Sequence, residues 1–235
     1  MVNHPEFSEL LKKFERLLRT TRPRSKTLLE IADVHHWELA HSNILAFFLD
    51  SRQEHGLADL FLTSLLEASG IDFSCVNMSR ANVKVDREVR TRENKCIDLV
   101  VETDHFVIGI ENKVFAKLDN PLTDYREWVK ERAREGEKKP HGVLLGLKKE
   151  TDKERLCNFF RSITYDELFS TIRKNLGPKA FTAEARGLTY LMDFVATIEN
   201  LKHGTRMDRQ LLDFLKENQK FAQQFSLWQF RSDFT

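Results

Sequence analysis

The stretch CIDLVVETDHFVIGIENKV, residues 96–114, decides the fold of this chain. Its two apolar runs, 96–102 and 106–114, are separated only by Thr103-Asp104-His105, which predicts a β-hairpin. Side chains alternate between the faces of a strand, and both faces of the second run are apolar at its beginning. The second run is therefore expected to be a central, buried strand.

Helices and further strands are predicted on both sides of this hairpin. Apolar periodicity predicts strands over 83–89, 142–148 and 159–164, and helices over 7–18, 37–49, 57–69, 119–135 and 165–175. Two more helices are marked by apolar residues between 181 and 198 and between 211 and 221. The predicted helix at 119–135 separates two apolar strands, which favours parallel pairing between them.

The predicted fold class is therefore α/β, a mixed central sheet flanked by helices, with added helices at both ends of the chain. We expect two domains. Residues 1–177 would form the α/β core with its N-terminal helices, and residues 178–235 would form a C-terminal helical extension packed on that core.

Composition bounds the class of protein without naming a partner. The chain has 235 residues, 37 Lys and Arg against 36 Asp and Glu, and a hydrophobic content of 41%, which excludes a disordered or collagen-like chain. Three scattered cysteines and the lack of a membrane-length apolar run predict a cytoplasmic protein with no membrane partner. A net charge of +1 means that nucleic-acid binding would depend on a local arrangement of charge. The stretch 130–155 has nine bases and six acids, and it is either a solvated face or an edge that faces phosphates.

Three charged residues lie within the two apolar strands. The hairpin could bring Asp98 beside Glu111, and alternation places Glu111 and Lys113 on one face near the end of their strand. Two adjacent carboxylates repel unless one is protonated or a cation lies between them. One interpretation is an internal ion pair with Lys113. The other is a site for a hard divalent ion such as Mg²⁺, in which Lys113 orients a water or stabilises charge on a phosphoryl group.

These residues resemble a known signature. Asp98, a step of 13 residues, and Glu111-Asn112-Lys113 are similar to the D…(D/E)-x-K pattern of the PD-(D/E)XK nuclease superfamily. The stretch ELAHS at 38–42, followed by an apolar helix, Leu49-Asp50 and His55-Gly56, resembles the N-terminal helix of one prokaryotic branch. In that branch I-E-N-K precedes a helix with a tyrosine, here Tyr125, so the resemblance covers 37–128.

The resemblance implies a restriction-endonuclease-like core and Mg²⁺-dependent hydrolysis of phosphodiesters, with Mn²⁺ as a substitute. Asp98 and Glu111 would bind the metal, and Lys113 would assist the attacking water. Glu38 would add a carboxylate, and the backbone carbonyl of Asn112 would be a further ligand. DNA is the favoured substrate, in restriction, repair or defence, and a homodimer would suit cutting of both strands.

The chain also departs from the pattern. Ile97 stands where the superfamily's name has proline. The branch has a glutamine-bearing stretch after the lysine, where this chain reads DNPLTDY at 119–125. Neither Asp119 nor Asn120 is therefore assigned to the site.

Other residues leave two interpretations open. Glu88 is either a third strand carboxylate near the metal or an exposed charge, and His41 is either a site residue or part of a polar helix stripe. The spacing of His35, His36, His41 and His55 fits no standard zinc ligand set. Two rivals to an enzyme stay open as well. One is an inactive module of the same fold that binds nucleic acid or protein, and the other is a protein partner bound through the C-terminal helices.

Overall fold

The computed structural model describes Glu9, Lys12 and residues 25–74, 76–78, 81–115, 121–177 and 183–217, with side chains in the last range described for 183–202 and Glu217. Its contacts divide the chain into two compact units, Leu28–Ile198 and a second one made of Met1–Thr27 with Glu199–Thr235. Apart from Glu9 and Lys12, which are helical, the helix predicted at 7–18 lies outside the described residues.

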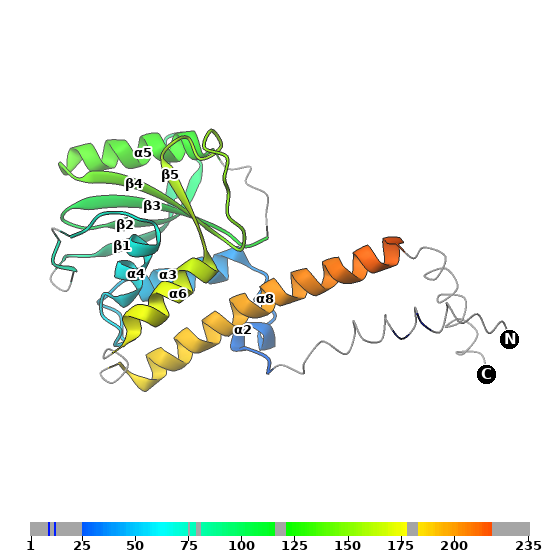
Figure 1. The fold of residues 1–235 in the computed structure, drawn as a ribbon. Coiled ribbons are helices and arrows are strands. Elements are labelled where there is room, and N and C mark those ends of the chain that lie inside the picture. Colours follow the sequence, from blue (N-terminus) through cyan, green and yellow to red (C-terminus); the bar gives the residue numbers. More distant parts are fainter. Residues whose placement is uncertain are drawn as a thin grey trace. The chain divides into compact units, whose positions relative to one another are not determined.

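The larger unit is built on a five-stranded mixed sheet. Its strands are β1 (Lys84–Arg90), β2 (Cys96–Glu102), β3 (Phe106–Lys113), β4 (Lys139–Gly146) and β5 (Phe160–Thr164), in the spatial order β1-β2-β3-β4-β5 (Figure 1). β1, β2 and β3 pair antiparallel, whereas β4 pairs parallel to both β3 and β5. The predicted hairpin and the parallel step after it are confirmed. β3 is the middle strand and is buried along its length up to Asn112.

Helices cover both faces of this sheet. The helices of the described residues are α2 (Leu28–Ile31), α3 (Glu38–Leu49), α4 (Leu60–Ala68), α5 (Leu122–Glu135), α6 (Tyr165–Leu176) and α8 (Ala185–Glu217). α5 connects β3 to β4 and lies on one face, and α3, α4 and α6 lie on the other (Figure 1). The predicted α/β class, a mixed sheet flanked by helices, is therefore confirmed.

Close packing fixes α5 against β3. Val129 is fully buried in an apolar cluster that joins α5 to Ile97, Val100 and Val107 of the sheet. A Cβ added at Gly109 would lie 2.7 Å from Cγ2 of Val129, so only glycine fits there. On the opposite face, Thr164 starts α6 with a capping box to Glu167, which fixes the beginning of that helix.

Several predicted boundaries were wrong, including the start of α4, which is Leu60 rather than residue 57. The two helices expected at the end of the chain are one helix, α8. Gly204 is the only Gly or Pro between their apolar stretches. A glycine costs a helix about 1 kcal/mol relative to alanine and does not end it by itself. β4 begins at Lys139 rather than at 142, because its parallel pairing with β3 starts at Phe106↔Lys139.

Candidate active site

The two strand carboxylates lie side by side. The β2–β3 register runs through Val100↔Gly109 and Leu99↔Ile110, so the next facing residues are Asp98 and Glu111. Their side chains are close enough to share a hydrogen bond. Asp98 also accepts a hydrogen bond of 2.8 Å at Oδ2 from the backbone N–H of Asn112. The hairpin therefore brings together the two residues that the sequence predicted as metal ligands.

Burial disfavours negative charge on this pair. Burial, and then the charge of Asp98, raises the pKa of Glu111 to about 8, and the Glu111 side chain is 0% exposed. Burial also raises the pKa of Asp98. Two adjacent carboxylates, of which Glu111 is buried and Asp98 is half-buried, repel unless one of them takes up a proton or a cation lies between them.

Lys113 lies beside these carboxyl groups. Its Nζ is 3.2 Å from Oε1 of Glu111 and 3.6 Å from Oε2 of Glu38. Burial alone would lower the pKa of Lys113, but the charges of Glu111, Glu38 and Asp98 outweigh it and raise that pKa. Lys113 is therefore a positively charged residue positioned by neighbouring carboxylates, and 16% of its side chain is exposed.

Glu38 is the first residue of α3, and its side chain connects this helix to the end of β3. Its Oε1 accepts hydrogen bonds from the backbone N–H groups of Val114, at 2.8 Å, and Phe115, at 3.0 Å. Its Oε2 faces Lys113. The structure thus brings Glu38 to the site, although a direct bond to a metal would compete with these contacts.

Asn112 turns its side chain to the opposite face. Its Oδ1 accepts a hydrogen bond from Tyr165 Oη at 2.7 Å, and its Nδ2 donates to Ser42 Oγ at 3.1 Å. Tyr165 was not among the predicted site residues, because no motif or periodicity in the sequence links it to Asn112. The role of the Asn112 carbonyl as a ligand stays a prediction.

The three weaker candidates lie in different surroundings. His41 is fully buried, burial lowers its pKa to about 4, and its ring faces Phe194 of α8. Tyr125 is buried in α5 and donates a hydrogen bond to the backbone carbonyl of Cys96, which ties α5 to the beginning of β2. Glu88 is exposed on the edge strand β1, between the paired residues Arg87 and Val89, and so lies across from Asp98. Its φ of 49° departs from strand geometry.

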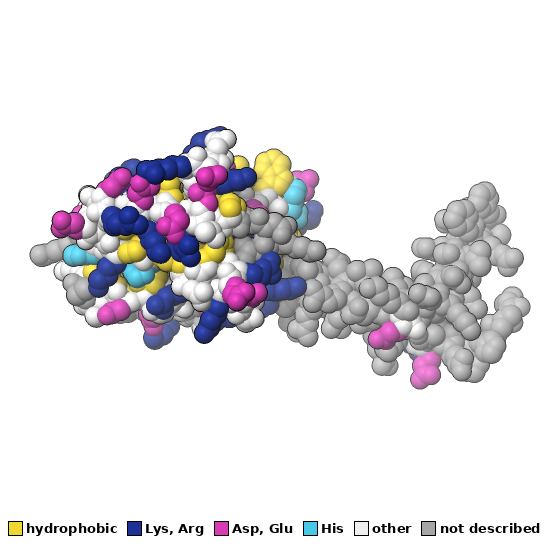
Figure 2. Space-filling view, turned by 90° about the horizontal axis from the view of Figure 1, so that it is seen from above, with side chains coloured by type: hydrophobic (Ala, Val, Ile, Leu, Met, Phe, Trp, Pro, Cys, Tyr) yellow, Lys and Arg dark blue, Asp and Glu magenta, His cyan; other side chains and the backbone are white. Residues whose placement is uncertain are grey.

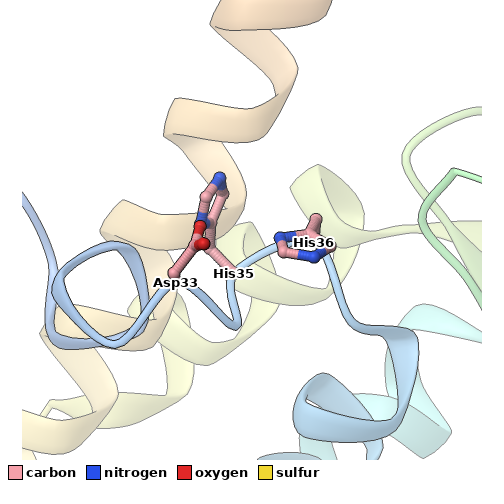
Figure 3. Close-up of side chains that lie close together, drawn as sticks. All are labelled: Asp33, His35 and His36. Atoms are coloured by element: carbon pink, nitrogen blue, oxygen red, sulfur yellow. The ribbon is translucent and has the colours of Figure 1, made fainter.

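Among the described residues, His41 and His55 do not join His35 and His36 in a group of potential metal ligands. Both ring nitrogens of His55 are engaged, with the carbonyl of Asp50 and the N–H of Leu57. Asp33, His35 and His36 have ligand atoms within 4.8 Å of one another, on the loop between α2 and α3 (Figure 3). His36 Nε2, however, already accepts a hydrogen bond of 2.7 Å from the Trp37 indole. A metal there would have to compete with that bond.

Ion pairs neutralise four of the nine bases in the stretch 130–155. Arg132 and Lys138 share Glu102, Lys149 pairs with Glu167, and Arg155 pairs with Glu150. On the face seen in Figure 2, dark blue and magenta side chains are interspersed. These pairings favour the solvated-face interpretation over a phosphate-facing edge.

Comparison with known proteins agrees with this geometry. The family model for the PD-(D/E)XK nuclease superfamily matches residues 27–220. No curated protein and no solved structure matches significantly. Within the described residues, none of the helices has the length and apolar character needed to cross a membrane. The match spans the sheet, the hairpin with Asp98 and Glu111, and the helices around them, and the chain belongs to the PD-(D/E)XK nuclease superfamily.

Proposed function

We propose that this protein is a metal-dependent nuclease that hydrolyses phosphodiester bonds of DNA, with Mg²⁺ as the ion and Mn²⁺ as a substitute. The observation that carries the proposal is the pairing of the half-buried Asp98 with the fully buried Glu111 on adjacent strands, because two carboxylates placed in this way favour a cation between them. Membership of the superfamily supports a nuclease function and a nucleic-acid substrate. The choice of DNA over RNA rests on the resemblance in sequence.

The donor atoms suit a hard divalent ion. Two carboxylates on adjacent strands offer oxygen ligands only, and Mg²⁺ typically uses one or two carboxylates and keeps several waters. Asp98 and Glu111 would hold the ion, with the carbonyl of Asn112 as a third protein ligand. When bound, the ion would lower the pKa of a coordinated water and neutralise charge on the phosphate.

Lys113 would act on the reacting groups directly. Its ammonium is held between Glu111 and Glu38 and keeps its proton, because both carboxylates raise its pKa. A fixed N–H donor there can orient the attacking water or stabilise negative charge that develops on the phosphate. We assign Glu38 the task of holding Lys113 and the 114–115 backbone.

The cellular role is proposed from the resemblance alone. We expect a prokaryotic, cytoplasmic enzyme of restriction, repair or defence against foreign DNA. A homodimer would place two sites on one duplex, and the C-terminal helices are candidates for contact with a protein partner.

The alternative is a catalytically inactive binding module of the same fold. The 3.2 Å ion pair between Lys113 and Glu111 is the observation that favours it, because such a pair alone could neutralise a buried carboxylate. The complete set of Asp98, Glu111 and Lys113 favours the enzyme.

One assay separates the two functions. Purified protein is incubated with supercoiled, linear and single-stranded DNA, in Mg²⁺, in Mn²⁺ and in EDTA, beside Asp98→Ala and Lys113→Ala. Lys153→Ala, which changes an exposed lysine, is the matched control. We expect metal-dependent cutting that both site variants lose and the control keeps. Binding of DNA without cutting in any metal would support the inactive module, and equal cutting by all variants would refute the assigned site.

A further inference from the structure

Asn112 is a buried polar residue on an otherwise apolar strand face. It stands between Glu111 and Lys113, and strand alternation turns its side chain away from theirs. The other residues of β3 on that face are Phe106, Ile108 and Ile110. An apolar side chain at position 112 would match these neighbours, so the amide needs a different explanation.

The amide is held from two helices. Tyr165, the first residue of α6, donates its hydroxyl hydrogen to Oδ1, while Nδ2 donates to Ser42 Oγ and, at 3.4 Å, to the carbonyl of Glu38 on α3. Asn112 and Ser42 are 0% and 3% exposed, and Tyr165 is 1% exposed. These directional bonds between buried groups fix the position of the amide relative to both helices.

The backbone of the same residue reaches the carboxylate pair. The Asn112 N–H donates to Oδ2 of Asp98, and its peptide continues directly into Lys113. The Asn112 carbonyl is also the backbone ligand proposed above. A rotation of this residue would therefore move Asp98 relative to Glu111 and displace the lysine as well.

α3 forms hydrogen bonds with Asn112 and with the residues that follow β3. Ser42 lies one helical turn after Glu38, so both side chains project from the same face of α3. Ser42 holds the Asn112 side chain, and Glu38 holds the backbone N–H groups of Val114 and Phe115. Two side chains of α3, Ser42 and Glu38, therefore fix the end of β3 that carries Glu111.

We propose that Asn112 is a positioning residue. Its side-chain hydrogen bonds to Tyr165 and Ser42 hold Asp98 and Glu111 at the separation at which they share one divalent cation. This inference rests on the proposed nuclease function, but its first readout is metal binding without DNA. Groups that support metal ligands from behind typically change metal affinity or activity by about 10–100-fold when removed.

The test removes the network without leaving a buried polar group unpaired. The triple variant Asn112→Val/Ser42→Ala/Tyr165→Phe replaces all three residues by apolar ones, and Tyr165→Phe alone removes a single hydroxyl. Tyr190→Phe, at an exposed tyrosine of α8, is the matched control. Each protein is measured for melting temperature in EDTA, for Mn²⁺ affinity by calorimetry, and for kcat and KM on plasmid DNA.

We expect the triple variant to fold and to need about 10–100-fold more Mn²⁺ for half-saturation. Its kcat should fall while KM for DNA is unchanged, since the network touches no substrate. A folded triple variant that binds Mn²⁺ and cuts like the wild type would overturn the inference. If the triple variant does not fold, Tyr165→Phe decides: a Mn²⁺ affinity equal to that of Tyr190→Phe overturns it, and a weaker one supports it. Weaker Mn²⁺ binding in the variants of a wild type that never cuts DNA would support the positioning role and refute the nuclease function.

Discussion

Replacing Glu111 by glutamine should stabilise the metal-free protein. The pKa of Glu111 is about 8 in the folded chain, against an ordinary value of 4.5, mainly because burial disfavours its charge. Between these two pH values the folded protein binds more protons at Glu111 than the unfolded chain does, so the free energy of unfolding falls as pH rises. At 1.36 kcal/mol per pH unit, the cost at pH 7 is about 3 kcal/mol.

Glu111→Gln removes this titration and keeps a neutral group that can donate to Asp98. It also removes one partner of Lys113, which keeps Glu38, so part of the gain is offset. We expect a net gain of at least about 1 kcal/mol at pH 7 that grows toward pH 8. The assay is urea unfolding in EDTA at pH 5, 6, 7 and 8 for both proteins.

Mg²⁺ provides the control for this prediction. The ion should stabilise the wild type much more than Glu111→Gln, because it replaces the proton that the variant no longer titrates. A wild-type stability that is constant between pH 6.5 and 8, or a variant less stable than the wild type at pH 8, would contradict this prediction.

Three further predictions follow from single contacts. Because burial lowers the pKa of His41 to about 4, protonation of this ring should cost up to about 3 kcal/mol of unfolding free energy as pH falls from 6.5 to 4, in opposition to the gain at Glu111, and His41→Leu should become more stable relative to the wild type over this range in the same urea experiment. Glu38→Gln keeps an oxygen acceptor for the backbone but loses the charge beside Lys113, so cleavage rates should show kcat/KM reduced about 10-fold at an unchanged Mg²⁺ requirement. A raised Mg²⁺ requirement would instead indicate that Glu38 binds the metal. Gly109→Ala should cost about 1–3 kcal/mol in thermal unfolding because its Cβ meets Val129, and adding Val129→Ala should recover part of that loss, whereas additive losses would contradict this contact.

The sequence predicted the centre of this molecule because its signals there are local. The hairpin at 96–114 needs only two apolar runs and a three-residue turn, and the hairpin alone brings Asp98 to Glu111. Alternation along one strand was enough to place Lys113 beside Glu111, which the 3.2 Å contact reflects. The mixed sheet likewise follows from one strand–helix–strand step.

Contacts between distant segments could not be predicted in the same way. Tyr165 and Asn112 are 53 residues apart, and Ser42 and Asn112 are 70 apart, and no periodicity links them. The sequence left the bases between 130 and 155 open as a solvated face or a phosphate-facing edge, and it did not indicate that Glu102 of β2 neutralises Arg132 and Lys138. The two helices predicted on either side of Gly204 are one helix, because a glycine by itself does not end a helix.

Metal-dependent cleavage through Asp98 can be measured on supercoiled plasmid. Supercoiled plasmid is cut under single-turnover conditions by wild type and by Asp98→Asn, which preserves shape and removes the charge, at matched Mg²⁺ concentrations and in EDTA. We predict cleavage that requires the ion and is slower by about 100-fold or more in Asp98→Asn. Cleavage at the wild-type rate by folded Asp98→Asn, or by the wild type in EDTA, would contradict the account.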